Sequence, residues 1–183
     1  SNLLTPEKKL TLKWNNGEGI NFYQDIIIDD TFMITVNQRV ENNSAKLVTL
    51  YPYGLIRRSG EPETIDFFVL HEGPLGVFDG TLSEKSYGDL TEAGKKGINI
   101  KPNESGGWIG LTDKYWMTAL LPDQKQKYNF TYRKLSSNGG QYQTDFLGSA
   151  VTIPANSKGE FLSRTFAGAK RLALFDEYEQ KFN

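Results

Sequence analysis

The sequence contains no cysteine and a single histidine, His71, among its 183 residues. The lack of cysteine excludes disulfides, thiolate nucleophiles and cysteine-based zinc sites, and one imidazole supplies too few ligands for the usual zinc sites without thiolates. The aspartates also lack the spaced run of ligands that forms a calcium-binding loop. We therefore expect no metal site and no cofactor.

Neither sign of charge predominates, because 21 Lys and Arg residues balance 22 Asp and Glu residues to give a formal net charge of -1. The basic residues are scattered along the chain, so the electrostatic footprint of a nucleic-acid-binding protein is missing. Apolar runs are short, far below the ~20 residues that a membrane-spanning helix needs. We expect this chain by itself to be soluble and not to bind nucleic acid.

Aromatic residues, by contrast, make up 13% of the chain, and many of them stand at every second position. Such alternation places successive aromatic side chains on one face of a β-strand. Apolar patterns with the helical period are nearly absent before Gly168. The sequence therefore predicts a mainly β single domain over residues 1–183, with a sandwich of antiparallel strands over residues 5–167.

The predicted strands are organised around the stretch Gly106–Gln124, GGWIGLTDKYWMTALLPDQ. It reads as two strands joined at Thr112–Lys114, and both alternating sets of the second strand are largely apolar, which is typical of a strand covered on both sides. Glu72–Gly80 is rich in glycine and predicts a bent loop. Further strands are predicted at Leu10–Trp14, Ile20–Ile28, Phe32–Val40, Lys46–Arg57, Ile65–His71, Tyr128–Arg133, Tyr142–Phe146, Ala150–Ile153 and Glu160–Phe166.

The last segment differs, because good helix formers predominate from Ala169 to Phe182 after Gly168, where we expect the final strand to end. Four apolar side chains fall near one face of this amphipathic helix: Leu172, Phe175, Tyr178 and Phe182. Either this face packs on the sandwich, or it docks a partner or forms a joint near a membrane. We keep these four as candidate partner-binding residues.

The only candidate for acid–base chemistry by histidine is His71. It lies in phase with Ile65, Phe67 and Val69, which favours a packed structural role. Its neighbour Glu72 is poorly placed to cooperate with it, because adjacent strand residues point to opposite faces. No serine stands in a GxSxG elbow.

Carboxylates occur together at Asp29–Asp30 and as Asp113 with Asp123. The first pair falls in a predicted turn, where aspartate is favoured by hydrogen bonds to the local backbone. A glycosidase needs two carboxylates that face each other across a cleft, which a sequence does not show. The glycine groups do not form a phosphate-binding loop. We expect no catalytic residue and no enzymatic activity.

Four strings together resemble the periplasmic domain of the bacterial YidC membrane protein insertases. They are GGWIGLTDKYWMTALLPDQ, LYPYGLI at Leu50–Ile56, LHEGPLGVFDGTL at Leu70–Leu82, and FAGAK at Phe166–Lys170. The match spreads over most of the chain in the family's order. The resemblance implies a β-supersandwich of the galactose mutarotase type that ends in a C-terminal α-helix.

The resemblance also implies a function. The family inserts and folds inner-membrane proteins, alone or with the Sec translocon, and its periplasmic domain is linked to binding the accessory subunit SecF. The insertion chemistry lies among transmembrane helices, so no catalytic residue carries over. The resemblance therefore implies a non-catalytic scaffold and docking domain on the periplasmic face of the inner membrane, held by a multi-pass parent that serves membrane-protein clients.

Family domains usually carry more strands before the position of Lys8–Trp14, so the resemblance implies an N-terminally truncated domain. The competing hypothesis is a carbohydrate-binding or aldose-epimerase-like protein of similar fold, since fold alone does not separate the two. An epimerase needs an acid and a base that converge in one concave site. A position of His71 in an open cleft beside a carboxylate would favour the enzyme.

Overall fold

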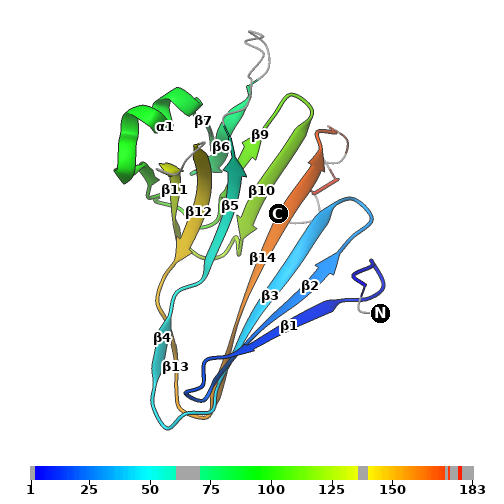
Figure 1. Ribbon diagram of the computed structural model, residues 1–183, viewed down its shortest axis with the longest axis vertical. Coiled ribbons are helices and arrows are strands. Elements are labelled where there is room, and N and C mark those ends of the chain that lie inside the picture. Colours follow the sequence, from blue (N-terminus) through cyan, green and yellow to red (C-terminus); the bar gives the residue numbers. More distant parts are fainter. Residues whose placement is uncertain (1–2, 61–70, 136–139, 172, 174–176, 179–183) are drawn as a thin grey trace.

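The computed structural model describes residues 3–60, 71–135, 140–171, 173, 177 and 178. This part of the chain is mostly strand, every strand pairing in it is antiparallel, and the strands form three sheets. Figure 1 shows two layers at the α1 end of the molecule and a fan of three strands that extends beyond them. The predicted mainly β sandwich of antiparallel sheets is confirmed.

The large sheet has eight strands in the order β1-β2-β3-β14-β10-β9-β6-β7. In that order the strands are β1 (Leu10–Asn15), β2 (Ile20–Ile28), β3 (Met33–Asn42), β14 (Ser157–Ala169), β10 (Trp116–Pro122), β9 (Trp108–Thr112), β6 (Gly73–Phe78) and β7 (Thr81–Glu84). The predicted central hairpin is confirmed as β9 and β10, and it lies in the interior of this sheet.

A second sheet of four strands has the order β5-β12-β11-β8, and a small sheet pairs β13 with β4. The bounds are β5 (Tyr53–Ser59), β12 (Gln141–Gly148), β11 (Tyr128–Leu135), β8 (Ile98–Ile100), β13 (Val151–Ile153) and β4 (Val48–Leu50). The helix α1 (Tyr87–Ala93) and the 3₁₀ turn Gly94–Lys96 connect β7 to β8. The predicted strand Ile65–His71 lies almost wholly outside the described residues.

The main core lies between the four-stranded sheet and the β6–β9–β10 part of the large sheet. Aromatic rings fill it at edge-to-face or tilted angles, as their quadrupoles favour. Phe130 and Phe146, for example, are fully buried and both contact Tyr128. The buried members are Phe78, Tyr87, Leu90, Ile109, Leu120, Tyr128, Phe130, Tyr132, Tyr142, Phe146 and Phe161.

The prediction of a loop at Glu72–Gly80 is wrong, because Gly73–Phe78 forms the strand β6 between β9 and β7. The glycines here serve close packing rather than a bend. A Cβ atom on Gly76 would lie 2.5 Å from the Trp108 carbonyl oxygen and 2.8 Å from the Tyr132 hydroxyl. A bare backbone is therefore required in the middle of this strand.

The strand predicted at Lys46–Arg57 is two strands, since pairing stops at Tyr51–Pro52 between β4 and β5. Proline lacks the N–H that a ladder needs, which agrees with a break at this point. The break lets β4 leave the four-stranded sheet and pair with β13 in an arm at the lower end of Figure 1.

The final strand ends later than predicted. Gly168 and Ala169 belong to β14, where they pair with Met117 and Trp116 of β10. The predicted helix at residues 169–182 therefore begins after Ala169, and Ala173, Glu177 and Tyr178 are helical. Gly168 does not end the strand. A side chain at this position would be crowded by Phe166 and Phe32, so close packing accounts for a glycine inside β14.

Candidate functional site

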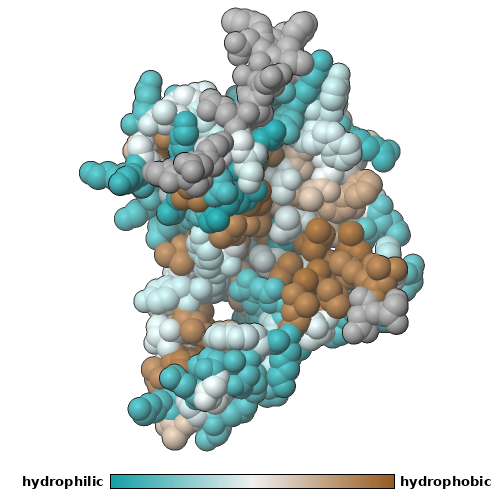
Figure 2. Space-filling view, viewed as in Figure 1, coloured by the Kyte–Doolittle hydropathy of each residue, from teal (hydrophilic) through white to brown (hydrophobic). Residues whose placement is uncertain are grey.

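One face of the β1–β2–β3 fan is apolar and lies beyond the cover of the four-stranded sheet. The register aligns Leu10 with Ile26 and Val36, Trp14 with Phe22, and Ile28 with Ile34. Figure 2 shows a broad hydrophobic area over these strands. The apolar residues of this surface, here called the apolar face, are Leu10, Leu12, Trp14, Phe22, Ile26, Ile28, Ile34, Val36 and Val40. Gln24 and Gln38 lie on the same side of the sheet, in register with Leu12, and interrupt it.

The exposure of the apolar face is greatest at its edge strand. The side chains of Leu12 and Trp14 are 48% and 62% exposed, and Trp14 stacks at a tilt against Phe22 with 5.1 Å between ring centroids. The alternation in Leu10–Trp14 predicts that Leu12 and Trp14 are buried on one face of the strand. In the structure both side chains are in contact with solvent. Exposed apolar side chains grouped on one face are typical of an interaction surface.

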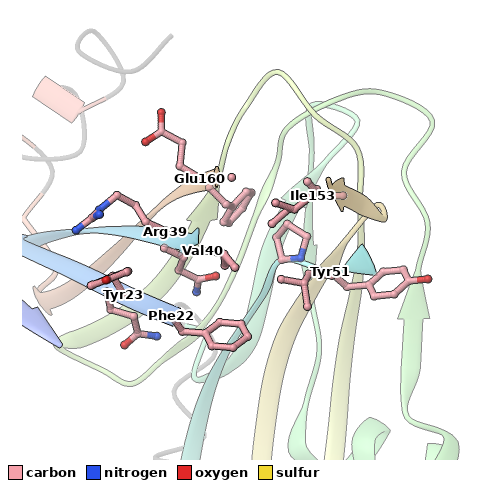
Figure 3. Close-up of a pocket in the computed structure, with 14 residues that line it drawn as sticks. Phe22, Tyr23, Arg39, Val40, Tyr51, Ile153 and Glu160 are labelled. Carbon is pink, nitrogen blue, oxygen red and sulfur yellow. The ribbon is translucent and has the colours of Figure 1, made fainter. Parts of the chain in front are cut away.

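A cleft of about 220 Å³ adjoins the apolar face where the fan meets the β4–β13 arm. Phe22 and Val40 come from the fan, and Ile153 faces them from the arm, while Arg39 points away from the gap (Figure 3). Leu50, Tyr51, Pro52, Val151 and Phe161 complete the apolar part of the lining. The cleft is therefore suited to an apolar side chain rather than to a charged ligand.

Asn42 holds the arm in position. This side chain is fully buried at the end of β3, and its Nδ2 donates to the carbonyl oxygens of Lys46 at 2.7 Å, Pro154 at 2.9 Å and Ile153 at 3.1 Å. Its Oδ1 accepts from the backbone N–H and hydroxyl of Ser44. Both chains of the arm are thereby tied to the large sheet, which fixes the width of the cleft.

The opposite face of the fan is polar. Arg39 and Asp25 form an ion pair at 2.6 Å, and Thr11 donates to the same carboxylate at 2.6 Å. These two hydrogen bonds lower the pKa of Asp25 to about 2. Lys158 pairs with Glu41 at 2.6 Å farther along this face. The alternation of each strand thus places most apolar side chains of β1–β3 on one face and most polar ones on the other. Exceptions include Gln24 and Gln38 on the apolar face and Ile27 on the polar face.

His71 does not lie in the cleft. Its Nε2 is 3.0 Å from the carbonyl oxygen of Pro74, and its ring lies beside Gly73, so the imidazole is engaged with the backbone at the start of β6. None of the described carboxylates forms a hydrogen bond or ion pair with His71. The arrangement set out above as favouring an epimerase is not seen in this part of the chain.

The candidate carboxylates lie apart from one another. Asp113 precedes β10 and pairs with Arg58 at 2.5 Å, whereas Asp123 follows the same strand and accepts from the N–H of Lys125. A strand of seven residues between them spans roughly 20 Å, so they do not form a catalytic pair.

Asp29 is a turn residue, as the sequence predicts. Its Oδ1 accepts from the backbone N–H groups of Thr31 and Met33, and the Tyr178 hydroxyl donates to its carboxylate. Burial raises the pKa of Asp29, but these hydrogen bonds outweigh burial and the pKa lies below its ordinary value. Its neighbour Asp30 is exposed.

Of the four candidate partner-binding residues, the structure describes Tyr178. Its ring packs against Phe166 in a cluster with Met33 and Ala119, on the face of the large sheet opposite the main core, and only 6% of the residue is exposed. Leu172, Phe175 and Phe182 lie outside the described residues. The described part of the helical face therefore packs on the sheet.

A polar network on the outer side of the four-stranded sheet is not predicted by the sequence analysis. The Gln143 Nε2 donates to Asp145 at 2.6 Å and to the Tyr53 hydroxyl, Arg57 donates to the Gln143 Oε1, and Arg133 pairs with Asp145 at 3.2 Å. The alternation of polar residues in Gln141–Asp145 is its only sequence signal. Its hydrogen bonds are internal, which indicates a structural role.

The described residues show neither a metal-binding cluster nor a membrane-spanning helix. Within residues 3–60, 71–135, 140–171, 173, 177 and 178, no group of three or more His, Cys, Asp or Glu side chains is arranged to hold a metal ion. No helix in the same part of the chain is long and apolar enough to cross a membrane. The candidate site rests on the exposed apolar side chains of the fan and on the cleft beside them.

Solved structures with a similar arrangement of strands include a sugar enzyme. A putative aldose 1-epimerase from Klebsiella pneumoniae superposes with a TM-score of 0.58 and 12% identity, over 95% of this chain and 53% of the epimerase. A protein from Synechocystis superposes with a TM-score of 0.54 and 6% identity, over 88% of this chain and 61% of that protein. Identities this low show a shared fold alone.

Curated relatives are much more similar in sequence. The membrane protein insertase YidC of Methylorubrum extorquens is 40% identical over 191 residues, and that of Beijerinckia indica is 41% identical over 180 residues. Each match covers 98% of this chain and 30% of the relative. The chain thus spans about 30% of the length of these relatives.

The family model described as the YidC periplasmic domain matches residues 1–183. This match covers the whole chain and agrees with the named relatives and with the strings of residues that carry the resemblance. The chain belongs to the YidC periplasmic domain family.

Proposed function

We propose that this chain is the non-catalytic scaffold and partner-docking domain of a YidC-type insertase. The parent is a multi-pass protein of the inner membrane that inserts and folds membrane-protein clients, and the domain docks components of the Sec translocon, SecF among them. Family membership and the name of the curated relatives support the parent's role. The relatives are about three times as long as this chain, which leaves room for the membrane-embedded part.

The observation that carries the docking role is the apolar face with its adjoining cleft. Leu12 and Trp14 remain largely exposed although their strand has the alternation of a buried element. Covering apolar area stabilises a complex by roughly 25 cal/mol per Å², before the costs of association are subtracted. A protein partner that lays an apolar surface on this face and a side chain into the cleft would gain this energy.

An epimerase-like activity is not proposed for this chain. The similarity to the aldose 1-epimerase is a similarity of fold at 12% identity. The cleft at the fan is lined mainly by apolar side chains, and His71 binds a backbone carbonyl elsewhere. Acid–base catalysis needs titratable groups that converge on the substrate.

The C-terminal helix belongs to the same proposal in a secondary role. Leu172, Phe175 and Phe182 remain proposed partner-binding residues. Tyr178 acts instead as the contact that seats the segment on the large sheet, through its ring and its hydroxyl. In this proposal the apolar face is the main docking surface, and the C-terminal helix contributes a second, smaller contact.

Site-specific photocrosslinking in native membranes tests the proposal. A photoreactive side chain at Leu12 of the full-length parent reports on the apolar face, and one at Lys13 reports on the polar face of the same strand. We expect a covalent adduct with a Sec subunit from position 12 and little or none from position 13. Adducts from Lys13 alone, or from neither position, would contradict docking through this face.

A further inference from the structure

One end of the large sheet carries a second group of exposed rings. The end is formed by the turn between β9 and β10, the end of β14 and the turn between β2 and β3, which the register brings together. Tyr115 is 64% exposed, Trp116 63% and Phe32 49%. We call this group, with Lys114, Lys170 and Arg171, the aromatic end.

The backbone holds the aromatic end firmly. The Asp113 N–H donates to the carbonyl oxygen of Trp116 at 2.8 Å and closes the β9–β10 turn, and the Lys170 N–H donates to that of Tyr115 at 2.8 Å. On the neighbouring turn the Ala167 N–H donates to the carbonyl oxygen of Phe32 at 3.2 Å. Trp116 thus lies on a paired strand, and Tyr115 and Phe32 lie in turns that these hydrogen bonds tie to the sheet.

Basic side chains accompany the rings. The Lys114 ammonium lies 5.1 Å from the centre of the Tyr115 ring, and Lys170 and Arg171 follow β14 directly. Three carboxylates also lie at this end. Asp113 is paired with Arg58, Asp29 accepts hydrogen bonds within the β2–β3 turn, and Asp30 is exposed. A surface with indole and phenol rings beside lysine and arginine matches the water–lipid interface, where such rings and cations gather.

We propose that the aromatic end contacts the surface of a phospholipid bilayer. The rings of Trp116 and Tyr115 lie at the level of the headgroups, and Lys114, Lys170 and Arg171 attract anionic headgroups. The match to a periplasmic domain whose relatives are named membrane protein insertases places a bilayer within reach. This role is separate from docking through the apolar face, because the two surfaces share no residue.

Quenching by lipid tests this contact with an internal control. Trp14 and Trp116 have nearly equal exposure, 62% and 63%, but lie on the apolar face and at the aromatic end respectively. The protein is mixed with vesicles of phosphatidylcholine and phosphatidylglycerol whose acyl chains are brominated near the headgroup. Trp116→Phe is expected to remove most of the quenching, whereas Trp14→Phe is expected to retain it.

Flotation of the same vesicles measures the affinity. The double variant Tyr115→Ala, Trp116→Ala is expected to reduce partitioning by about tenfold or more, since two rings no longer reach the interface. Lys114→Gln with Lys170→Gln is expected to weaken binding to vesicles with phosphatidylglycerol more than to those of phosphatidylcholine alone. Circular dichroism checks that each variant stays folded.

Three outcomes would overturn the proposal: no binding to either vesicle, quenching that is lost in Trp14→Phe and kept in Trp116→Phe, or partitioning that the double variant leaves unchanged. The second outcome would assign lipid contact to the apolar face. Crosslinking of a Sec subunit to Leu12 is measured separately, and the first and third outcomes leave it untouched, so the two proposals can fail independently.

Discussion

Asn42 shows how much one buried amide determines at the scale of the residue. Its Nδ2 bonds three carbonyl oxygens from two segments of the arm. In the sequence it stands in a turn-like cluster, Asn42–Ser44, and nothing in that cluster indicates contacts with Ile153 and Pro154 more than a hundred positions away. The sequence therefore shows an asparagine in a turn but does not show its distant hydrogen-bond partners.

We expect Asn42→Ala to destabilise the protein by about 2–3 kcal/mol, because buried carbonyl oxygens lose their donor. The neighbouring Asn43→Ala is the matched control, since Asn43 is exposed, and it should cost well under about 1 kcal/mol. Urea unfolding measures both. Equal effects of the two variants on stability would contradict the role of Asn42 in holding the arm to the large sheet.

Asp25 and Arg39 give a dependence of stability on pH. The register pairs Asp25 with Asn37, so Arg39 is its diagonal neighbour across β2 and β3, a relation that depends on register rather than on sequence spacing. The hydrogen bonds from Arg39 and Thr11 lower the pKa of Asp25 from 3.8 to about 2. The stabilisation is therefore present above pH 3.8 and is lost as the pH falls toward 2.

Asp25→Asn should accordingly lower the free energy of unfolding by about 1–2 kcal/mol at neutral pH and by much less near pH 2. Chemical denaturation at a series of pH values checks the profile. Asp30→Asn serves as the exposed control and should leave the profile unchanged. A constant difference between Asp25→Asn and the wild type across this range would contradict the ionic contribution.

At the scale of the element, alternation of apolar residues was sufficient to predict most strands. The hairpin of β9 and β10, and β11 with β12, follow their patterns closely. The alternation does not predict β6 because this strand contains glycine in place of apolar side chains. At Gly76 the Trp108 carbonyl oxygen and the Tyr132 hydroxyl lie so close to the backbone that a side chain would not fit. The predicted start of the C-terminal helix, at Ala169, is too early for a related reason. Gly168 indicates a strand end in the sequence, but in the structure it is paired with Met117 inside β14.

Gly76→Ala tests this explanation of β6. The new methyl group would lie within 3 Å of three atoms: one in the neighbouring strand β9, one in the facing sheet and one in β6 itself. We therefore expect a loss of stability of about 2–4 kcal/mol. Gly80→Ala provides the contrast: no atom lies within 4 Å, and its positive φ of 69° leaves a strain of about 1 kcal/mol. Thermal unfolding separates the two costs. A milder effect at Gly76 than at Gly80 would refute the packing argument.

At the scale of the whole molecule, the sequence pattern shows which residues share a face but not which faces are covered. The alternation in Leu10–Trp14 predicted a half-buried strand, and the layered fold leaves Leu12 and Trp14 in contact with solvent because the four-stranded sheet stops short of the fan. The candidate site is thus found where the sequence pattern predicts buried side chains and the structure leaves the same side chains exposed. Recognition of the family came from long strings of residues, which do not encode that exposure.

The central claim, that a protein partner covers the apolar face, is tested most directly by the fluorescence of Trp14. Trp108 and Trp116 are both replaced by Phe, so that Trp14 is the only one of the chain's three tryptophans that remains. Purified Sec translocon containing SecF is titrated into this variant, the emission of the translocon alone is subtracted, and complex formation is followed independently. We predict that the emission shifts to shorter wavelength as the complex forms, because Trp14 and Phe22 leave water. A complex that forms while the emission stays unchanged would contradict the claim.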